Sequence, residues 1–460
     1  MTVTREQPRI LIGASNSGGG KTTVVCALLA ALTHQGYQPA AFKCGPDYID
    51  PLFHQEVIGA KGANLDLFFT REETVCQLLG KFSHGCGVAV IEGVMGYYDG
   101  VGGTTSRASA WEVAKATQTP AVLVLDARGA ALSLCAQLKG FLEFAAPSMI
   151  KGVILNRCSP MQYQLLAAML EERCGVQVFG YLPQDPDFGL ESRHLGLVTA
   201  SEIEDMKDKL CRWGEKLRLT VDVPRLMKLA ETASPLYYEE KTEKPLGQGF
   251  RIAVAKDKAF CFYYRENLTL LEELGAEIVP FSPLEDAALP QNIHALYLGG
   301  GYPELYAQRL SQNVAMRSAV ARAVAKRMPV LAECGGFMYL QEAIADEQNT
   351  RYPMAGVFKG SCSNTGSLSR FGYITLTAQR DTFLCKAGES IAAHEFHYYD
   401  STNNGQSFTA TKPVSGRSWQ CIQGSDRLFA GFPHLYFYSN KDFAKQFVLA
   451  AQAYQKEIEQ

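Results

Sequence analysis

The sequence predicts an α/β protein with two domains, each built around a parallel sheet. Apolar strands alternate with helical segments through the first half, a charged stretch without apolar period follows, and the alternation then begins again. Continuous apolar strands separated by helices are typical of parallel sheets covered on both faces. The chain of 460 residues is also too long for one core. We therefore expect domains at 1–236 and 250–460, joined by a linker at 237–249 that ends in Pro and Gly.

The composition is that of an ordinary globular protein and gives no sign of a nucleic-acid or membrane partner. The formal net charge is −3 and no basic block occurs, so a phosphate backbone would not be attracted. No apolar run reaches about 18 residues and the N-terminus lacks the apolar core of a signal peptide, so we expect a cytoplasmic protein. The thirteen cysteines are odd in number and form no CxxC pair, which favours reduced thiols over disulfides or a zinc site.

The first element in chain order is a phosphate loop, LIGASNSGGGKTT at 11–23. An apolar strand at 10–12 leads into a glycine cluster whose backbone amides can face one anion. Lys21 brings a positive charge to the outer phosphates, and Thr22 offers a hydroxyl group to magnesium. Apolar residues at i, i+3, i+4 and i+7 from Val25 predict the helix that must follow, with its N-terminus at the phosphates.

This loop departs from the usual pattern at Ser15, where a glycine normally stands six residues before the lysine. A glycine-rich turn with an incidental lysine is the alternative interpretation. Because strand, loop, lysine, threonine and helix stand in the right order, we favour ATP binding. The residues expected to contact ATP in the loop are Ser17, Gly18, Gly20, Lys21, Thr22 and Thr23.

Four further strands are predicted in the first half, at 39–43, 87–92, 121–126 and 152–156. Ligands of parallel sheets bind at the carboxyl ends of the strands. The carboxylates near those ends are Asp47, Asp50, Glu92 and Asp99. Together with Thr22 they form the oxygen-rich set that hard divalent cations require, so magnesium bound to ATP is the expected occupant. For Asp50 and Asp99, a helix N-cap or a solvated loop charge is an equally good interpretation.

Two other positions in this half have open roles. Asn156 ends its strand in VILNR and either reads the nucleotide base or serves as a turn residue. The loop DPDFGLESRHLGLV carries Arg193 and His194, which together suit an anionic ligand. A surface arginine held by Glu191 is the alternative.

The second half begins a new α/β unit, with strands predicted at 250–255, 276–280, 295–298 and 329–333 and a helix at 264–274. The last of these strands opens into Cys334-Gly335-Gly336. A cysteine between a buried strand and a helix, followed by two glycines, has the geometry of a nucleophile elbow, whose amides can bind an oxyanion. We expect the helix N-terminus to lower the pKa of the thiol, and the glycine run at 299–301 to supply a second amide. A buried structural cysteine is the alternative.

A cysteine nucleophile needs a base, and the chain has eight histidines. The downstream candidates are His394 and His397 in AHEFHYY and His434 in GFPHLY. The HxxH spacing can indicate a metal site, but the aromatic alternation around these residues is typical of strands, which makes a metal the weaker interpretation.

Seven motifs, taken in order, resemble the cobyrinate a,c-diamide synthase family, the glutamine-dependent corrinoid amidases of cobalamin biosynthesis. They are GASNSGGGKTT, KCGPDYIDP, EGVMGYYDG, LPQDPDFGLESRHLGLV, GGGYPE, AECGGFMYL and AHEFHYY. Each motif alone is modest, but the ordered set is specific and covers nearly the whole chain. The resemblance implies a P-loop, dethiobiotin-synthetase-like ATP domain followed by a class I glutamine amidotransferase domain.

The resemblance also implies roles for individual residues. Cys334 would be the glutaminase nucleophile and His434 its base, with backbone amides at Gly300 and Gly335 facing the oxyanion. Asp47 and Glu92 would join Thr22 at magnesium. The residues placed on the corrinoid or acyl-phosphate side would be Asp50, Asp99, Arg193 and His194.

The segment around His434 departs from the family pattern. Relatives usually read Ser-Tyr-x-His-Leu-His, whereas this chain reads Gly-Phe-Pro-His-Leu-Tyr at 431–436. The glutamate that follows the histidine by two residues in ordinary amidotransferase triads is also absent. We therefore expect a Cys/His dyad, in which the group that orients the imidazole is not identified.

The implied activity is ATP-dependent amidation of the a and c side-chain carboxylates of cobyrinate through an acyl phosphate. Glutamine or free ammonia would supply nitrogen and Mg²⁺ would be the cofactor, so the expected partners are ATP, L-glutamine and a tetrapyrrole carboxylate. Ni-sirohydrochlorin and hydrogenobyrinate are alternative substrates, and a non-catalytic P-loop ATPase scaffold is an alternative of another class. A homodimer is a possible assembly.

Overall fold

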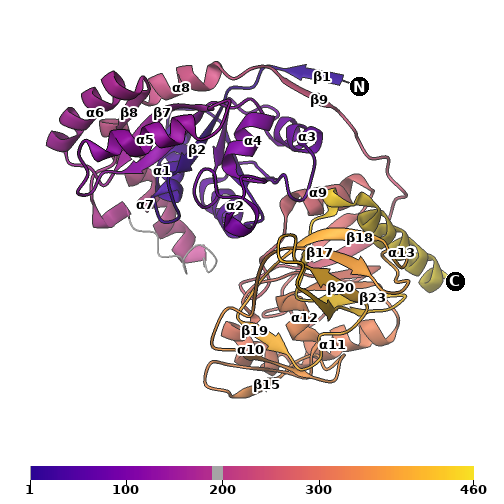
Figure 1. The fold of residues 1–460 in the computed structure, drawn as a ribbon. Coiled ribbons are helices and arrows are strands. Elements are labelled where there is room, and N and C mark those ends of the chain that lie inside the picture. Colours follow the sequence, from indigo (N-terminus) through magenta and orange to yellow (C-terminus); the bar gives the residue numbers. More distant parts are fainter. Residues whose placement is uncertain (1, 189–199) are drawn as a thin grey trace. The chain divides into compact units, whose positions relative to one another are not determined.

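The chain forms two compact units, at 1–241 and 242–460, in a computed structural model that describes residues 2–188 and 200–460 (Figure 1). Each unit contains a parallel sheet of its own, as the sequence predicts. The boundary between the units lies within 237–249, the stretch that we predicted as the linker. In the part of the chain that the structure describes, no helix combines the length and apolarity that crossing a bilayer requires.

The beginning of the predicted linker is in fact a strand. β9 (Leu236–Glu239) pairs antiparallel with β1 (Thr2–Arg5). Its residues alternate between buried and exposed, and the ring of Tyr238 lies so close to Gly80 that a Cβ there would be 2.3 Å from it. The prediction of a linker from residue 237 is therefore wrong for 237–239, because a period of two over four residues is too short to stand out in a charged stretch.

A seven-stranded parallel sheet forms the centre of the first unit, in the order β4-β3-β5-β2-β6-β7-β8. Its strands are β2 (Arg9–Ala14), β3 (Pro39–Cys44), β4 (Asn64–Leu65), β5 (Val88–Glu92), β6 (Ala121–Asp126), β7 (Ile150–Asn156) and β8 (Gln177–Tyr181). Every residue of β2, β3 and β5 is buried, because both faces of the sheet are covered. Since β2 lies between β5 and β6, the carboxyl ends of these neighbours flank the phosphate loop.

Helices α1 (Lys21–His34) and α7 (Ala200–Thr220) pack together against one face of this sheet (Figure 1). Their backbones approach closely at Gly214, where a Cβ would lie 2.8 Å from the backbone nitrogen of Ala31. Trp213 is fully buried in the same core. The other helices of the unit are α2 (Ile49–Phe53), α3 (Glu72–Phe82), α4 (Ala110–Ala116), α5 (Ser133–Glu143), α6 (Pro160–Cys174) and α8 (Val223–Glu231).

The second unit is built on a six-stranded sheet in the order β11-β10-β12-β13-β23-β22. Its strands are β10 (Arg251–Ala255), β11 (Glu277–Phe281), β12 (Ala295–Leu298), β13 (Val330–Glu333), β22 (Gln423–Gly424) and β23 (Leu428–Gly431). All neighbours are parallel except β22 and β23. The helices of this unit are α9 (Arg265–Glu273), α10 (Ala307–Gln312), α11 (Val314–Ala325), α12 (Gly335–Leu340) and α13 (Lys441–Glu459).

Antiparallel strands bring the predicted histidine motifs beside this sheet. A five-stranded sheet has the order β21-β20-β17-β18-β24, and in it His394 of β18 pairs directly with His434 of β24. Its strands are β17 (Arg370–Ala378), β18 (Ser390–His397), β20 (Phe408–Thr411), β21 (Ser418–Cys421) and β24 (His434–Leu435). A smaller sheet contains β14 (Ala343–Ala345), β15 (Arg351–Pro353), β16 (Ser361–Asn364) and β19 (Tyr399–Ser401). The strand assignment of both histidine motifs is thus confirmed.

Candidate active sites

The phosphate loop joins β2 to α1 and turns through two glycines in the left-handed region. The φ angles are 73° at Gly18 and 96° at Gly20, which only glycine adopts without strain. Lys21 is the first residue of α1, and its Nζ donates hydrogen bonds to the carbonyl oxygens of Asn16 at 3.3 Å and Met95 at 2.5 Å. The loop is therefore held with the lysine folded back over it, at the N-terminus of a 14-residue helix.

Burial of Lys21, followed by the like charge of Lys43, lowers the pKa of its ammonium group to about 8. The side chain is only 7% exposed. An anion placed on the loop would favour the charged form of this lysine. The loop is thus suited to a ligand that brings several negative charges.

Asn156 braces the phosphate loop from the end of β7. Its Nδ2 donates to the carbonyl oxygen of Gly19 at 3.0 Å, and its Oδ1 accepts the backbone N–H of Arg157 at 3.0 Å. A Cβ at Gly20 would lie 2.1 Å from Nδ2, so only glycine fits there. This geometry gives Asn156 a supporting role that we had not considered, beside our two interpretations of it as a turn residue or as one that reads the nucleotide base.

An ion pair next to the loop was not anticipated from the sequence. Asp126 at the end of β6 accepts from Arg157 at 2.7 Å and from Arg128 at 2.9 Å, and Arg157 also reaches the carbonyl oxygen of Gly18 at 3.4 Å. Burial acts to raise the pKa of Asp126, but these hydrogen bonds outweigh it and hold the pKa at about 2. The sequence feature that could have indicated this ion pair is that Asp126, Arg128 and Arg157 all lie at or just after the end of a predicted strand.

A buried cluster of carboxylates surrounds the other side of the loop. Glu92, at the end of β5, is fully buried, and its Oε1 accepts from the Thr22 hydroxyl at 2.6 Å and from Lys43 Nζ at 2.9 Å. Lys43 also donates to Asp50 Oδ2 and lies 3.8 Å from Asp47 Oδ2. The structure thus brings together Thr22, Glu92, Asp47 and Asp50, which the sequence predicted to meet.

Charge pairing controls the protonation of this cluster. Burial acts to lower the pKa of Lys43, but the carboxylates of Asp50 and Glu92 outweigh it and raise the pKa well above its usual value. Burial acts to raise the pKa of Asp50, but Lys43 lowers it below its usual value. Burial and the adjacent Asp50 raise the pKa of Asp47 to about 7. The lysine therefore stays charged and pairs with Asp50 and Glu92 beside the loop.

Lys43 and His54 are the functional candidates that sequence reasoning missed. Lys43 ends a buried strand and stands inside the motif KCGPDYIDP, which was a usable signal. His54 is 1% exposed and its Nε2 lies 3.4 Å from Glu92 Oε2. Burial lowers the pKa of His54, so the ring is neutral in this environment. Neither residue could be paired with Glu92 before the order of β3 and β5 in the sheet was known.

The residues at this centre fit a magnesium ion. The Thr22 hydroxyl, Asp47 and Glu92 offer oxygen ligands, and Glu92 Oε2 is buried without a hydrogen-bond partner. Among the described residues, no group of three or more His, Cys, Asp or Glu side chains is arranged to hold a metal ion by itself. Magnesium usually takes only one or two carboxylates from the protein and completes its shell with phosphate oxygens and water.

The remaining predicted residues of this domain lie at the rim or outside the described part. Asp99 accepts the backbone N–H of Gly96 at 2.8 Å and so stabilises the loop that follows β5; Lys21 contacts the same loop at Met95. Arg193 and His194, with Glu191, lie outside the described residues.

Cys334 forms a strained elbow between β13 and α12. Its φ and ψ angles are 46° and −102°, a conformation that costs free energy and is found mainly at functional positions. Its backbone N–H donates to Gly431 of β23 at 2.8 Å. A Cβ at Gly336 would lie 2.1 Å from the carbonyl oxygen of Leu298. A glycine is therefore required at position 336, because β12 approaches it closely.

His434 and Cys334 meet at Gly300. A Cβ built on Gly300 would lie 2.3 Å from His434 Cε1, 3.0 Å from His434 Nε2 and 3.4 Å from Cys334 Cβ. The imidazole and the cysteine thus flank one small space that glycine leaves open. Gly335 donates its backbone N–H to the thiol and partly offsets the effect of burial there.

Burial dominates the protonation of this pair. It raises the pKa of the Cys334 thiol, with a further contribution from Glu304. The lowering that we predicted at the helix N-terminus comes from the Gly335 N–H, but desolvation of the thiolate is the larger effect. Burial, followed by His397, lowers the pKa of His434 to about 3. The pair therefore rests as neutral thiol and neutral imidazole.

Glu333 places a carboxylate behind the imidazole. It is the residue before Cys334, it is 2% exposed, and its Oε2 lies 3.9 Å from His434 Nδ1. Tyr297 donates its hydroxyl to Oε2 at 2.9 Å, and the backbone N–H of Leu435 donates to Oε1 at 3.0 Å. Burial raises the pKa of Glu333 to about 8. No local pattern indicates this contact, because it joins the end of β13 to β24, about 100 residues further along the chain.

The two other histidines do not form a metal site with each other. His397 Nδ1 is 2.6 Å from the carbonyl oxygen of Tyr399, and its ring stacks on Phe432 at 4.0 Å between centroids. His394 lies opposite His434, and burial, followed by the charge of His434, lowers the pKa of His394 to about 3. Both histidines lie in β18, the strand position that we predicted for them.

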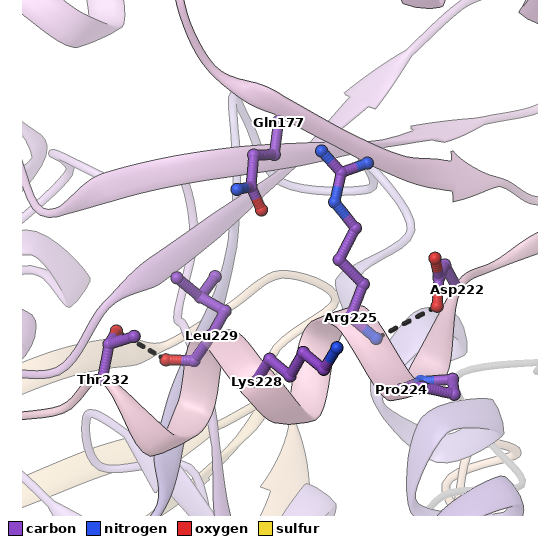
Figure 2. A pocket seen from close by; sticks show the side chains of 7 residues that line it. All are labelled: Gln177, Asp222, Pro224, Arg225, Lys228, Leu229 and Thr232. Atoms are coloured by element: carbon purple, nitrogen blue, oxygen red, sulfur yellow. Dashed lines mark hydrogen bonds between the residues drawn. The ribbon is translucent and has the colours of Figure 1, made fainter.

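A separate hollow of about 630 Å³ lies next to α8 in the first unit. Figure 2 shows Arg225 and Leu229 extending from this helix toward Gln177, with Lys228 on the same helix also lining the hollow. Gln177 is the first residue of β8, so the hollow lies at the amino end of a parallel strand, at the edge of the sheet opposite the phosphate loop. Ligands of such sheets bind at the carboxyl ends, and we assign the hollow no part in the reaction.

Comparison with known proteins finds a match for each of the two units. Residues 10–198 match the CobQ/CobB/MinD/ParA nucleotide binding domain, and residues 251–442 match the CobB/CobQ-like glutamine amidotransferase domain. A cobyrinate a,c-diamide synthase of Caldanaerobacter subterraneus subsp. tengcongensis is 40% identical over 95% of this chain and 97% of that protein. Proteins of the same name from Clostridium acetobutylicum and Clostridium tetani are 41% and 39% identical, each over 95% of this chain and 99% and 98% of their own lengths.

Proposed function

The chain belongs to the cobyrinate a,c-diamide synthase family, and from this premise we propose how its residues divide the reaction. The activity is glutamine-dependent amidation of cobyrinate in cobalamin biosynthesis, performed by a carbon–nitrogen ligase. The first unit activates the a and c carboxylates with ATP, and the second releases ammonia from glutamine. The observation that carries this division is the presence of two separate reactive centres, one at Lys21 and one at Cys334.

The ATP centre turns a carboxylate into an acyl phosphate. A carboxylate is a poor electrophile, so the γ-phosphoryl group is transferred to one of its oxygens, and ammonia then displaces phosphate. Lys21 and the loop amides stabilise the charge that spreads over the transferring group. The loop contacts are those of Ser17, Gly18, Gly20, Lys21, Thr22 and Thr23, and Asn156 holds the loop in place.

Magnesium, when bound, neutralises phosphate charge, and Thr22, Asp47 and Glu92 would hold it. Lys43 lowers the pKa of Asp50 and donates hydrogen bonds to both Asp50 and Glu92, which holds the two side chains in place before the nucleotide arrives. We assign Asp50 and Asp99, with Arg193 and His194, to the side where the corrinoid carboxylate or its acyl phosphate lies.

The glutaminase centre uses Cys334 as nucleophile and His434 as base. His434 Nε2 takes the thiol proton as sulfur attacks the amide carbon, and it returns that proton to the leaving ammonia. Water then releases glutamate from the thioester. Backbone amides at Gly300 and Gly335 would face the oxyanion. Strain at Cys334 and the fit of His434 against Gly300 support this assignment.

The test is a direct assay of purified protein with ATP, magnesium, glutamine and a candidate tetrapyrrole, followed by mass measurement. With cobyrinate we expect two successive exchanges of a hydroxyl for an amino group. Ni-sirohydrochlorin and hydrogenobyrinate serve as competing substrates. If the enzyme converts either of them faster than cobyrinate, that compound is the preferred substrate. Absence of glutamine hydrolysis would favour the P-loop ATPase scaffold. We place the enzyme in the cytoplasm, and a homodimer is compatible with the proposal.

A further inference from the structure

A Cys/His pair needs an acceptor on the far side of the imidazole. For His434 to act as a base through Nε2, its proton must stand on Nδ1, and in comparable sites a carboxylate fixes that tautomer. The position two residues after the histidine holds Tyr436, whose buried ring packs edge-on against Tyr264 at 5.1 Å. The usual source of the carboxylate is therefore filled by an aromatic side chain.

Glu333 lies where that acceptor is needed. Its Oε2 is 3.9 Å from His434 Nδ1, and the carboxyl group is fixed by Tyr297 from β12 and by the backbone of Leu435 from β24. A separation of 3.9 Å is too long for a hydrogen bond. Hydrogen bonds of catalytic groups are often long without substrate and shorten when it binds, so a movement of about 1 Å completes the contact.

We infer that Glu333, the residue immediately before the nucleophile, is the positioning residue that orients His434 for glutamine hydrolysis. The inference rests on the proposed roles of Cys334 and His434. In this arrangement the third member of the triad comes from the end of β13 instead of the strand that carries the histidine.

The protonation state of Glu333 decides which tautomer it supports. Ionised Glu333 accepts the proton on Nδ1 and leaves Nε2 free to take the Cys334 proton, and it stabilises the imidazolium that results. Protonated Glu333 instead donates to Nδ1 and forces the proton onto Nε2, where it blocks the base. Because burial raises the pKa of Glu333 to about 8, glutamine hydrolysis should rise as the pH increases through about 8.

Other groups face Glu333 from each element packed against it. Tyr297 of β12 donates to it, and Tyr263, which precedes α9, contributes to the same buried environment. Burial raises the pKa of both phenols, as it does for the Cys334 thiol, and burial lowers that of His434 to about 3. Among these groups Glu333 is thus the one expected to titrate near pH 8.

The experiment compares Glu333→Gln with Tyr297→Phe as a matched control in the full-length protein. Glu333→Gln keeps the volume and can still accept from Leu435, and we expect kcat for glutamine hydrolysis to fall roughly 10²-fold or more with little change in KM, and the rise near pH 8 to disappear. Tyr297→Phe removes a hydrogen bond to the same carboxyl group but keeps the carboxylate. It should retain the rise in rate, displaced to higher pH.

Three outcomes decide the inference. A wild-type kcat in Glu333→Gln would overturn it. Equal losses of kcat in Glu333→Gln and Tyr297→Phe, with unchanged pH profiles, would also overturn it, because they would indicate a structural role. Amidation with ammonium salt at close to the wild-type rate shows that Glu333→Gln is folded. Cys334→Ser separates the inference from its premise: if that variant still hydrolyses glutamine, the proposed glutaminase centre is wrong, whereas if it is inactive and Glu333→Gln is not, only the role of Glu333 fails.

Discussion

The two reactive centres keep ionisable groups out of water in opposite ways. At the ATP centre, buried Lys43 stays charged because Asp50 and Glu92 pair with it. At the glutaminase centre, burial moves Cys334, His434 and Glu333 toward their neutral forms. The first centre is therefore charged before its ligand arrives, and the second must generate its charges during the reaction.

The difference follows from the chemistry of each ligand. Nucleotide phosphates and magnesium are charged in the ground state, so preformed charges bind them directly. The glutamine amide is neutral, and a resting thiolate near it would be exposed to side reactions with oxidants. Paired charge thus suits the synthetase, and a buried neutral pair suits the glutaminase.

The largest expected effect separates the two centres by nitrogen source. Cys334→Ser should lower glutamine-dependent amidation at least about 10⁴-fold, because the attacking sulfur is lost. Amidation with ammonium salt should continue, since the ATP centre is untouched, and assays with the two donors measure both. His434→Ala should behave likewise with some residual glutaminase. If Cys334→Ser lost amidation with both nitrogen donors, this residue would instead belong to the synthetase chemistry or to the core.

Lys21→Ala tests the ATP centre, and its effect, unlike that of Cys334→Ser, should not depend on the nitrogen donor. Loss of its point charge at the phosphates should reduce amidation with either donor about 10²- to 10³-fold, as measured by product formation under saturating ATP. Glutamine hydrolysis without acceptor provides the control and should persist. Turnover close to wild type would remove the phosphate-loop assignment.

Glu92→Gln tests whether the negative charge of Glu92 is needed to bind magnesium. The variant can still accept from Thr22 but offers magnesium no charge, so we expect ATP to bind while apparent magnesium affinity falls about 10- to 100-fold. A titration of amidation against magnesium concentration measures this. An unchanged magnesium requirement would contradict the assignment of Glu92 as a ligand.

The smallest effect is expected at Asn156. Asn156→Ala removes one hydrogen bond to the loop at Gly19, which is worth about 1 kcal/mol, so KM for ATP should rise roughly fivefold. Preference for ATP over GTP should stay the same, because the side chain supports the loop. A change in that preference would instead restore the interpretation that Asn156 reads the base.

The sequence predicted the parts of the molecule in which local pattern decides the structure. The phosphate loop at 11–23 and the elbow at Cys334 each show strand, glycine and helix signals within a short segment, so both could be located. Lys43 and Glu333 could not be given partners, because their contacts with Glu92 and His434 join residues 49 and 101 positions apart. Those contacts depend on strand order. The net shift in the pKa of Cys334 could not be predicted, since burial of the thiol is a tertiary property that outweighs the local effect of the helix N-terminus.

Gly300 has a consequence for the way in which this enzyme can evolve. A single methyl group at this position would stand 2.3 Å from His434 Cε1, so Gly300→Ala would displace the imidazole without altering any reacting group. The product would be an enzyme that depends on ambient ammonium and no longer draws on the amino-acid pool. Given the proposed role of His434, a change of one codon at Gly300 should therefore stop glutamine hydrolysis while amidation with ammonium continues.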